Sequence, residues 1–292
     1  NAGTGFLYKM LRKKNITLNK KKADGSEILQ AGDMIQVFFS DETFSKMRGQ
    51  EAVSSEYQKL LQVPHELQVI YEDDLMLIVN KPSGMLSQKA SESDISLNES
   101  ILSYLIHEGL LSEETYAVFH PSIANRLDRN TSGIVLAGKT LAGQQFLSDI
   151  LRDRSAKKIY HCIVRGKVEE EMHLKGYLLK DERSNQVQIF SDETQDAKPI
   201  ETAYRPLVVG PDATLLEVHL ITGRSHQIRA HLASIGHPIA GDPKYGDMVW
   251  NKKLRQDFSV RSQLLHAYSI TLPDGRTFIA DEPEIFSQIM RG

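Results

Sequence analysis

The chain has 292 residues, of which 40% are hydrophobic and 25% are charged, with no excess of glycine or proline. The single cysteine, Cys162, excludes an internal disulfide, no segment resembles a signal peptide, and no apolar run approaches the roughly 20 residues that a membrane span needs. We therefore expect a globular protein of the reducing cytoplasm with no membrane partner, built as one large domain or as one large and one small domain.

The net charge of −3 weighs against a nucleic-acid partner, but the charge is unevenly distributed. The first 23 residues hold seven cations and no acid: Lys9, Arg12, Lys13, Lys14, Lys20, Lys21 and Lys22. Such a cluster is typical of a surface that meets phosphate, although a solvated helix face explains a basic run equally well.

Two short zones precede the main part of the chain. Residues 1–45 have the pattern of a small compact unit, and residues 46–66 are polar and charged, as in a linker. The elements predicted in these zones are a helix at 6–14, a strand at 16–18, a β-rich run at 34–39 and a short helix at 56–62.

Residues 67–292 mix strands and helices. The predicted strands lie at 76–79, 133–137, 159–164, 215–220 and 268–272, and the predicted helices at 97–107, 141–151, 226–235 and 284–290. Strand follows strand too often for a doubly wound parallel fold, and Asp274-Gly275 is typical of a hairpin turn. We therefore predict an α+β domain with a mixed, largely antiparallel central sheet and flanking helices.

The segment from Asn125 to Gly133 reads Asn-Arg-Leu-Asp-Arg-Asn-Thr-Ser-Gly. It places Asp128 between Arg126 and Arg129, ahead of four residues that favour turns and before a predicted buried strand. A carboxylate on a tight turn is well placed to be held in one orientation, and adjacent cations favour its ionised form. An ionised carboxylate acts as a nucleophile or a general base. For this segment taken alone, an aspartate that caps a turn is the commoner explanation.

A second segment, residues 220–232, combines a glycine that breaks a strand with the start of a predicted helix. Ser225 is a candidate helix cap, and the free N–H groups of a helix N-terminus bind anions, so residues 222–225 are a candidate phosphate contact. Arg229 lies about one turn into the helix. An inward guanidinium needs an acidic partner or a phosphate, and Asp128 is the natural candidate.

Structural explanations compete at this segment too. A surface salt bridge accounts for Arg224, and a helix histidine with satisfied hydrogen bonds accounts for His226 or His231. The spacing of the two histidines weakly suggests a metal, but no cysteine or third ligand joins them, so we expect no metal site.

Two further residues are candidates by position. Lys81 stands at a predicted strand end, where it could contact RNA, and an exposed lysine in a turn is an equally good explanation. Tyr160 begins a strand and could lay its ring against a base, since aromatic rings often stack on unpaired bases. A buried sheet tyrosine is the commoner role for any single such residue.

Four segments in this order resemble the RluA-type pseudouridine synthases, in particular the RluC/RluD branch named for ribosomal large-subunit RNA. They are YEDDLMLIVNKPSG, NRLDRNTSGIVLAGKT, KKIYHCIVRG and ITGRSHQIRAHLASIGHPIAGDPKYG, and they lie between about residues 67 and 270. The combination of RLDxxTSG with TGRxHQIRxH is specific to this family.

The resemblance implies a role for each matching residue. Asp128 would be the catalytic aspartate with Arg229 as its partner, Tyr160 would stack against the target uracil, and Arg126 would fill the space of the flipped nucleotide. The remaining candidates for binding the substrate are Lys81, Thr222, Arg224 and His226. Asp128 could attack the anomeric carbon, add to the ring, or remove the 2′ proton of the ribose, and these alternatives stay open.

The resemblance also implies the pseudouridine synthase fold, no cofactor and no metal, and an RNA partner, with large-subunit ribosomal RNA favoured. We expect a monomer by default. Many relatives carry histidine where this chain has Gln88 and Asn125, which blurs the subfamily and hence the RNA target.

The first zone resembles the αL-type RNA-binding domain of a ribosomal small-subunit protein. The matching run is KMLRKKNITLNKKKADGSEILQAGDMI, which corresponds to the second helix of that domain and the strands after it. The first helix has no counterpart, so we expect a truncated module.

Two other classes of function fit parts of the sequence. An RNA-binding assembly factor accounts for the basic zone and the arginine-rich loops, but not for Asp128 within the four-segment pattern. A nucleoside hydrolase would use Asp128 with water and would release free uracil.

Overall fold

The computed structural model describes residues 4–40, 50–181, 184, 186–194 and 196–291. The chain divides into two compact units, one formed by Asn1–Gln62 and Gly109–His120 and the other by Val63–Glu108 and Pro121–Gly292. In the described part of the chain, no helix combines the length and the apolar character needed to cross a bilayer.

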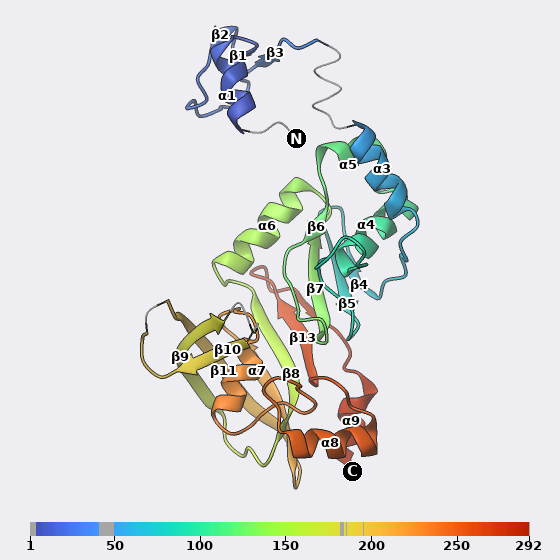
Figure 1. Ribbon diagram of the computed structural model, residues 1–292, viewed down its shortest axis with the longest axis vertical. Coiled ribbons are helices and arrows are strands. Elements are labelled where there is room, and N and C mark those ends of the chain that lie inside the picture. Colours follow the sequence, from blue (N-terminus) through green and yellow to red (C-terminus); the bar gives the residue numbers. More distant parts are fainter. Residues whose placement is uncertain (1–3, 41–49, 182–183, 185, 195, 292) are drawn as a thin grey trace. The chain divides into compact units, whose positions relative to one another are not determined.

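The N-terminal segment of the first unit folds as one helix and a small sheet (Figure 1). Helix α1 (Thr4–Arg12) precedes strands β1 (Ile16–Leu18), β2 (Lys21–Lys22) and β3 (Ile35–Val37), which pair antiparallel in the order β2-β1-β3. The helix starts and ends two residues earlier than predicted, the strand at 16–18 is confirmed, and β3 lies within the predicted β-rich run.

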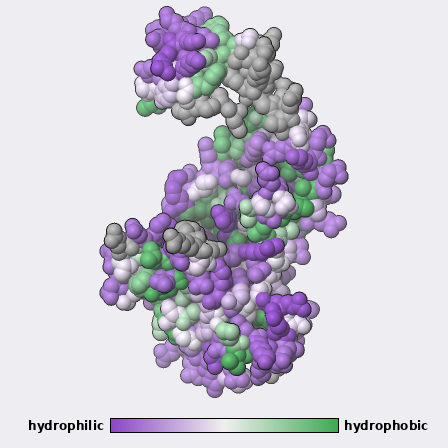
Figure 2. All heavy atoms as spheres, in the orientation of Figure 1, coloured by the Kyte–Doolittle hydropathy of each residue, from purple (hydrophilic) through white to green (hydrophobic). Residues whose placement is uncertain are grey.

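The surface of this segment is divided by polarity. Figure 2 shows hydrophilic residues gathered on one side of it and hydrophobic residues on the other. The large apolar side chains that are exposed after α1 are Ile28, Leu29, Met34, Ile35, Val37 and Phe38. The backbone between β2 and β3 is fixed in part by Asn19, whose Nδ2 donates to Asp33 Oδ1 at 2.7 Å.

The first unit also holds two helices. Helix α3 (Gln50–Leu60) begins six residues before the helix predicted at 56–62, and α5 (Glu113–Val118) was not predicted. The Tyr57 hydroxyl donates to the Leu111 carbonyl oxygen at 3.0 Å, and its ring centroid lies 6.0 Å from that of Tyr116. The helix in the expected linker is therefore anchored to a segment that follows it by more than 50 residues.

The second unit is built on an 11-stranded sheet, most strands of which are labelled in Figure 1. Its strands are β4 (Val69–Glu72), β5 (Met76–Lys81), β6 (Ser122–Ile123), β7 (Ser132–Gly138), β8 (Lys157–Arg165), β9 (Met172–Asp181), β10 (Gln186–Phe190), β11 (Lys198–Val209), β12 (Ala213–Leu220), β13 (Leu265–Thr271) and β14 (Thr277–Ile279).

The strand order is β10-β9-β11-β12-β8-β13-β7-β5-β4, with β14 beside β13 and β6 beside β7. Among the described strands, β7 and β13 pair parallel and the other pairs are antiparallel. The predicted mixed, largely antiparallel sheet is confirmed, and β13 and β14 form the hairpin expected at Asp274-Gly275.

The central strands have nearly continuous apolar sequences because both faces of the sheet are covered there. Each residue of β7 is buried, and so are six consecutive residues of β8, including Cys162 with no exposed surface. In β12 buried residues alternate with half-buried ones, which is the pattern of a strand with one face nearer to solvent.

Helices α4 (Leu97–His107), α6 (Leu141–Arg152), α7 (Gln227–Ser234), α8 (Met248–Phe258) and α9 (Glu284–Arg291) accompany the sheet. Local signals explain the helix starts. A Ser96–Glu99 capping box opens α4, and the Thr140 hydroxyl accepts the Gly143 N–H at 3.1 Å at the start of α6. Helix α8 and strands β9 to β11 were not predicted.

Candidate active site

The loop between β6 and β7 carries Asp128, and three polar side chains fix its backbone. Asn125 accepts the Leu136 N–H at 2.8 Å and donates to the Ile134 carbonyl at 3.2 Å, so its amide extends the hydrogen bonding of β7. The Ser87 hydroxyl donates to the Leu127 carbonyl at 2.8 Å and accepts the Leu127 N–H at 3.0 Å. The backbone N–H and carbonyl groups of Leu127, the residue before Asp128, are therefore both held by Ser87.

Lys81 has a different place from the one predicted. Its side chain is fully buried, and the ammonium donates to three carbonyl oxygens, of Pro82 at 3.0 Å, Met85 at 2.8 Å and Arg129 at 3.0 Å. All three of its donors are used inside the protein, so the predicted contact with RNA is wrong. Burial lowers the pKa of Lys81 to about 8, although the negative charge of Asp128 acts in the opposite direction. Lys81 instead joins the Asp128 loop to the loop after β5.

The C-terminal end of the loop passes into β7 through Gly133. Its φ is +109°, and a Cβ atom there would lie 2.3 Å from the carbonyl oxygen of Ala267 on β13. Only glycine combines this backbone conformation with so close an approach of the neighbouring strand. Ser132, one residue earlier, shares a 2.8 Å hydrogen bond with His266 Nδ1, whose Nε2 lies 3.0 Å from the Ala280 carbonyl oxygen.

Arg229 joins two carboxylates. Its Nη1 donates to Asp128 Oδ2 at 2.7 Å, while its Nε and Nη2 donate to the two oxygens of Asp242 at 2.7 and 2.9 Å. The Arg229 side chain is 5% exposed and that of Asp242 is completely buried, whereas the side chain of Asp128 keeps 28% of its surface exposed. The expected partnership of Asp128 and Arg229 is thus present in the geometry, with the acid open to one side.

The fork between Arg229 and Asp242 is a strong and directional contact. Burial acts to raise the pKa of Asp242, but the hydrogen bonds and charge of Arg229, with the N–H groups of Lys244 and Tyr245, outweigh it and hold the pKa below its usual range. Asp242 is therefore ionised at neutral pH. Asp242 thus holds one edge of the guanidinium, through Nε and Nη2, and leaves Nη1 for the contact with Asp128.

The start of α7 differs from the prediction. The N-cap is His226, in a left-handed conformation with φ of 55°, and its side chain makes no capping hydrogen bond, so Ser225 is not the cap. Gln227, the first residue of α7, instead ties the preceding loop to the helix, because its Oε1 accepts the N–H of Arg224 at 3.1 Å and the hydroxyl of Thr222 at 2.8 Å. Thr222 is 4% exposed, and its hydroxyl is used within the protein rather than presented to a phosphate.

His226 lies beside Asp128. Its Nε2 is 3.9 Å from Asp128 Oδ2, and its Nδ1 is 2.9 Å from the hydroxyl of Tyr245, which also accepts the Val187 N–H. Burial lowers the pKa of His226, although the charge of Asp128 acts to raise it. A neutral ring that accepts the Tyr245 proton at Nδ1 carries its own proton on Nε2, facing the carboxylate.

Tyr160 is a predicted site residue that belongs to the central sheet. It lies on β8, 8% exposed, and burial together with the charge of Asp128 raises the pKa of its hydroxyl above the usual range. The action of Asp128 on this hydroxyl places the two side chains in the same electrostatic environment.

Two predicted site residues are on the surface. Arg126 and Arg224 are exposed, and neither side chain makes a hydrogen bond or an ion pair with a residue that the structure describes. Arg126 lies two residues before Asp128 and Arg224 two residues before His226, so both guanidinium groups are available to a polyanion beside the acid.

Sequence reasoning missed three residues of the site: Asp242, Tyr245 and Ser87. Asp242 and Tyr245 come from the run Gly-Asp-Pro-Lys-Tyr-Gly, which reads as a loop, and their roles depend on the fold bringing that loop to α7. The available signal was that an inward Arg229 has more donors than one carboxylate uses, so a second acid was to be expected.

Comparisons with known proteins support the family resemblance seen in the sequence. The family model for RNA pseudouridylate synthase matches residues 75–234. The chain is 33% identical over 273 residues to "Ribosomal large subunit pseudouridine synthase C" of Haemophilus ducreyi. This alignment covers 93% of this chain and 80% of the relative. The protein of the same name from Escherichia coli K12 is 33% identical over 272 residues, or 91% of this chain and 79% of the relative. The solved structure of "Human RNA Pseudouridylate Synthase Domain Containing 4" covers 82% of this chain and 96% of its own, with a TM-score of 0.61 and 19% identity, and shows the same fold.

Proposed function

The chain belongs to the RNA pseudouridylate synthase family and isomerises uridine to pseudouridine in RNA, and we propose that large-subunit ribosomal RNA is its substrate and Asp128 its catalytic carboxylate. The choice of RNA is supported by the names of relatives that match more than nine-tenths of the chain. The choice of Asp128 is supported by one observation above the others, the 2.7 Å contact that joins it to a buried arginine.

The reaction breaks the bond between N1 of uracil and C1′ of ribose, turns the base over and joins C5 to C1′, while C5 loses its proton and N1 gains one. The ribose carbon becomes electron-poor when its bond to nitrogen breaks, as in glycoside cleavage. Asp128 would act at this point, by attack on C1′, by addition to the ring or by removal of the 2′ proton. In each case Arg229 holds the reacting oxygen in place.

The target base has to leave its stack before Asp128 can reach it, at a cost of a few kcal/mol. We propose that Tyr160 meets the flipped uracil and that Arg126 fills the vacated space in the RNA, which offsets part of this cost. The Asp128 side chain is 28% exposed without substrate, so the base itself would complete the exclusion of water. Exclusion of water prevents the release of free uracil.

The remaining residues have supporting roles in this proposal. His226 borders the carboxylate and, with the exposed Arg224, would bind the substrate, whereas Lys81 and Thr222 hold the loops that carry the site. The proposed domains are an RNA-binding module at 1–45, a linker at 46–66 and the catalytic domain at 67–292. We propose a monomer that works without a cofactor in the cytoplasm, where ribosomal RNA is modified.

The proposal is tested with Asp128→Asn and an unmodified transcript of large-subunit ribosomal RNA labelled with tritium at C5 of uridine. We expect the variant to fold and to bind the transcript, and to release no tritium, because the amide keeps the shape of the side chain and loses its charge. Turnover by the variant would contradict the role of Asp128.

The choice of RNA has its own test. Pseudouridines are mapped in the large-subunit RNA of cells that lack this gene and of the same cells with the gene restored. We expect one or more sites to be lost and regained. An unchanged map would contradict ribosomal RNA as the substrate, and free uracil in the assay would instead indicate a nucleoside hydrolase.

A further inference from the structure

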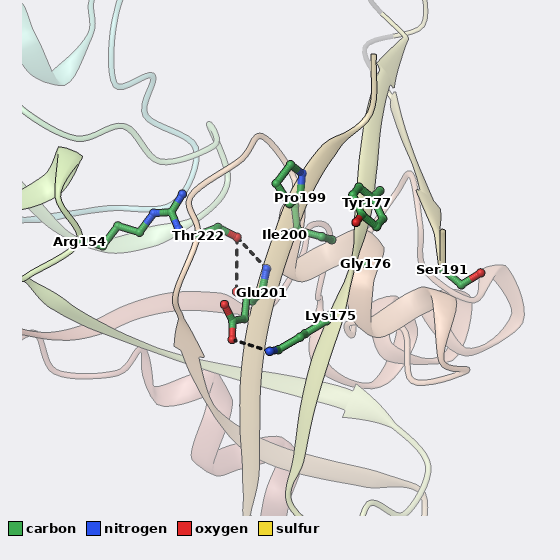
Figure 3. Close-up of a pocket in the computed structure, with 9 residues that line it drawn as sticks. All are labelled: Arg154, Lys175, Gly176, Tyr177, Ser191, Pro199, Ile200, Glu201 and Thr222. Atoms are coloured by element: carbon green, nitrogen blue, oxygen red, sulfur yellow. Dashed lines mark hydrogen bonds and ion pairs between the residues drawn. The ribbon is translucent and has the colours of Figure 1, made fainter. Parts of the chain in front are cut away.

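A pocket of about 380 Å³ lies where β9, β11 and the loop after β12 meet, among residues that the proposed mechanism does not use for chemistry (Figure 3). Its volume is within the range of roughly 300–1,000 Å³ that is typical of small-molecule sites. The lining side chains that can bind a ligand are Arg154, Lys175, Tyr177, Ser191, Glu201 and Thr222.

One end of the pocket carries positive charge without a counter-ion. Arg154 is exposed and has no hydrogen bond or ion pair with any residue in the described ranges. Lys158, nearby on β8, is partly buried, has no carboxylate partner there either, and is repelled by Arg154. Repulsion between two neighbouring cations is unfavourable, and more so when one of them is partly buried. An anion between or beside the two cations relieves this repulsion.

The carboxylate in the pocket does not cancel this charge. Glu201 Oε1 is 2.7 Å from His173 Nε2 and 3.7 Å from Lys175 Nζ, so its charge is already shared with two groups on β9. Figure 3 shows Lys175 turned toward Glu201, with Arg154 on the far side of Thr222. Among the described residues that line the pocket, the cation without a counter-ion is therefore Arg154.

The other end of the pocket offers an aromatic surface. Tyr177 and Pro199 are cross-strand partners on β9 and β11, and they stand side by side in Figure 3. The Tyr177 ring is half-buried, and its hydroxyl makes no hydrogen bond with a described residue. A ring that lies open beside a cation is the usual arrangement for an unpaired base and its phosphate.

The wall of the pocket is connected to the helix of the active site. Thr222 lines the pocket and donates through its hydroxyl to Gln227, the first residue of α7. Gln227 Nε2 also donates to the carbonyl oxygen of Glu201 at 3.0 Å. Helix α7 carries Arg229, so a ligand in the pocket rests on the structure that positions the guanidinium beside Asp128.

We propose that this pocket holds a second nucleotide of the RNA substrate, a neighbour of the target uridine, with its base against Tyr177 and its phosphate at Arg154. The inference rests on the proposed function, because a chain that turns a base out of its stack leaves the neighbouring bases without a stacking partner. A second aromatic site on the protein replaces that partner. Ser191, on the rim of the pocket, is placed to contact the edge of the base.

The test measures binding of an unmodified large-subunit ribosomal RNA transcript by the full chain in the Asp128→Asn background, in which no conversion occurs. Tyr177→Ala should raise the Kd roughly 5- to 100-fold, which is the loss of binding expected for one stacked base. Tyr177→Phe keeps the ring and should bind within about twofold of the parent, as expected for stacking without a hydroxyl contact.

Arg154→Gln tests the phosphate contact, with Arg152→Gln as its matched control on an arginine paired to Asp149. Removal of one phosphate contact to single-stranded RNA should reduce the slope of log Kd against log salt by about 0.7. Equal binding by Tyr177→Ala and Tyr177→Phe, or equal slopes for the two arginine variants, would overturn the pocket proposal. Failure of the proposed function would show itself separately, as a wild-type chain that converts no uridine in the transcript.

Discussion

At the scale of single residues, the site depends on how one guanidinium is held. Arg229 contacts Asp128 through a single nitrogen and Asp242 through two. The bidentate contact is the more buried one and restricts the rotation of the side chain, so Asp242 determines where the remaining nitrogen points. Asp242 does not face the substrate in this arrangement and acts through Arg229, as a positioning residue.

Replacement of Asp242 by asparagine should affect stability and catalysis together. The amide keeps the size of the side chain but leaves Arg229 with one carboxylate, so we expect a loss of roughly 3 kcal/mol in the free energy of unfolding. A guanidinium that moves by about 1 Å should lower kcat about 100-fold with little change in KM. Urea unfolding and steady-state turnover, measured at a temperature where the variant is folded, check both effects.

Asp149→Asn is the control for this prediction, because Asp149 pairs with Arg152 on the exposed surface and should change stability by less than about 1 kcal/mol. A variant of Asp242 that is less stable and yet retains full kcat would show that Asp242 supports the fold alone.

The sequence singled out Asp128 and Arg229 by their recognisable segments, and the structure brings these two side chains into contact, whereas the roles proposed for them and for Tyr160 stay predictions. It was misleading for Lys81, since a lysine at a strand end is usually solvated and nothing local shows that three carbonyl oxygens converge on it. It did not reveal Asp242, whose partner is 13 residues away and meets it only after α7 and the following loop have packed.

At the scale of elements, the Asp128 loop is held by the strands on either side of it. Gly133 is the closest point, since β7 and β13 run parallel there and Ala267 is its register partner. The position of the Asp128 loop therefore depends on the pairing of β7 with β13, whose paired residues are more than 130 positions apart in the sequence. Conditions that separate β7 from β13 should also displace Asp128.

Gly133→Ala should be strongly destabilising. The new Cβ atom would lie 2.3 Å from a backbone oxygen, and φ would remain at +109°, so we expect a loss of roughly 2–5 kcal/mol in the free energy of unfolding. Gly236→Ala is the matched control, because Gly236 has φ of +85° with nothing within 4 Å of a Cβ. It should lose only about 1–2 kcal/mol. Chemical denaturation that gave equal losses would show that backbone strain, rather than the contact with β13, dominates at Gly133.

Elements with long periodic or apolar patterns were predictable, and those without were not. Helix α4 has the bounds predicted, and β5, β7, β8 and β12 extend the predicted strands by a few residues. Strands β9 to β11 were missed because charged and polar side chains on their open face interrupt the apolar pattern. Helix α8 was missed because, among its described residues, Leu254 is the one fully buried apolar side chain.

At the scale of the whole molecule, the active site belongs to one of the two units. The side chains that surround Asp128 all lie in the unit that begins at Val63, whereas the seven cations of the first 23 residues lie in the other. The residues proposed for catalysis and the basic cluster therefore belong to different units of the chain. The cluster would contribute to RNA binding through phosphate contacts.

Deletion of residues 1–45 should leave kcat at saturating RNA nearly unchanged and raise KM several-fold, because the described contacts of Asp128 lie within the second unit and the phosphate contacts proposed for the basic cluster are lost. Steady-state kinetics at two salt concentrations checks this, and the salt dependence of KM should weaken. A full-length variant with Lys20, Lys21 and Lys22 replaced by glutamine separates the loss of charge from the loss of the segment. A large fall in kcat on deletion would place the segment in the catalytic machinery.

The two carboxylates that share the Arg229 guanidinium leave the trio with an overall negative charge at the place where a polyanion has to dock. A phosphodiester would be repelled from this point, whereas an uncharged pyrimidine would not. In the proposed reaction the trio would therefore favour entry of the nucleobase over that of a phosphate, and the RNA backbone would lie toward the exposed arginines at 126 and 224, which pair with no residue in the described part of the chain.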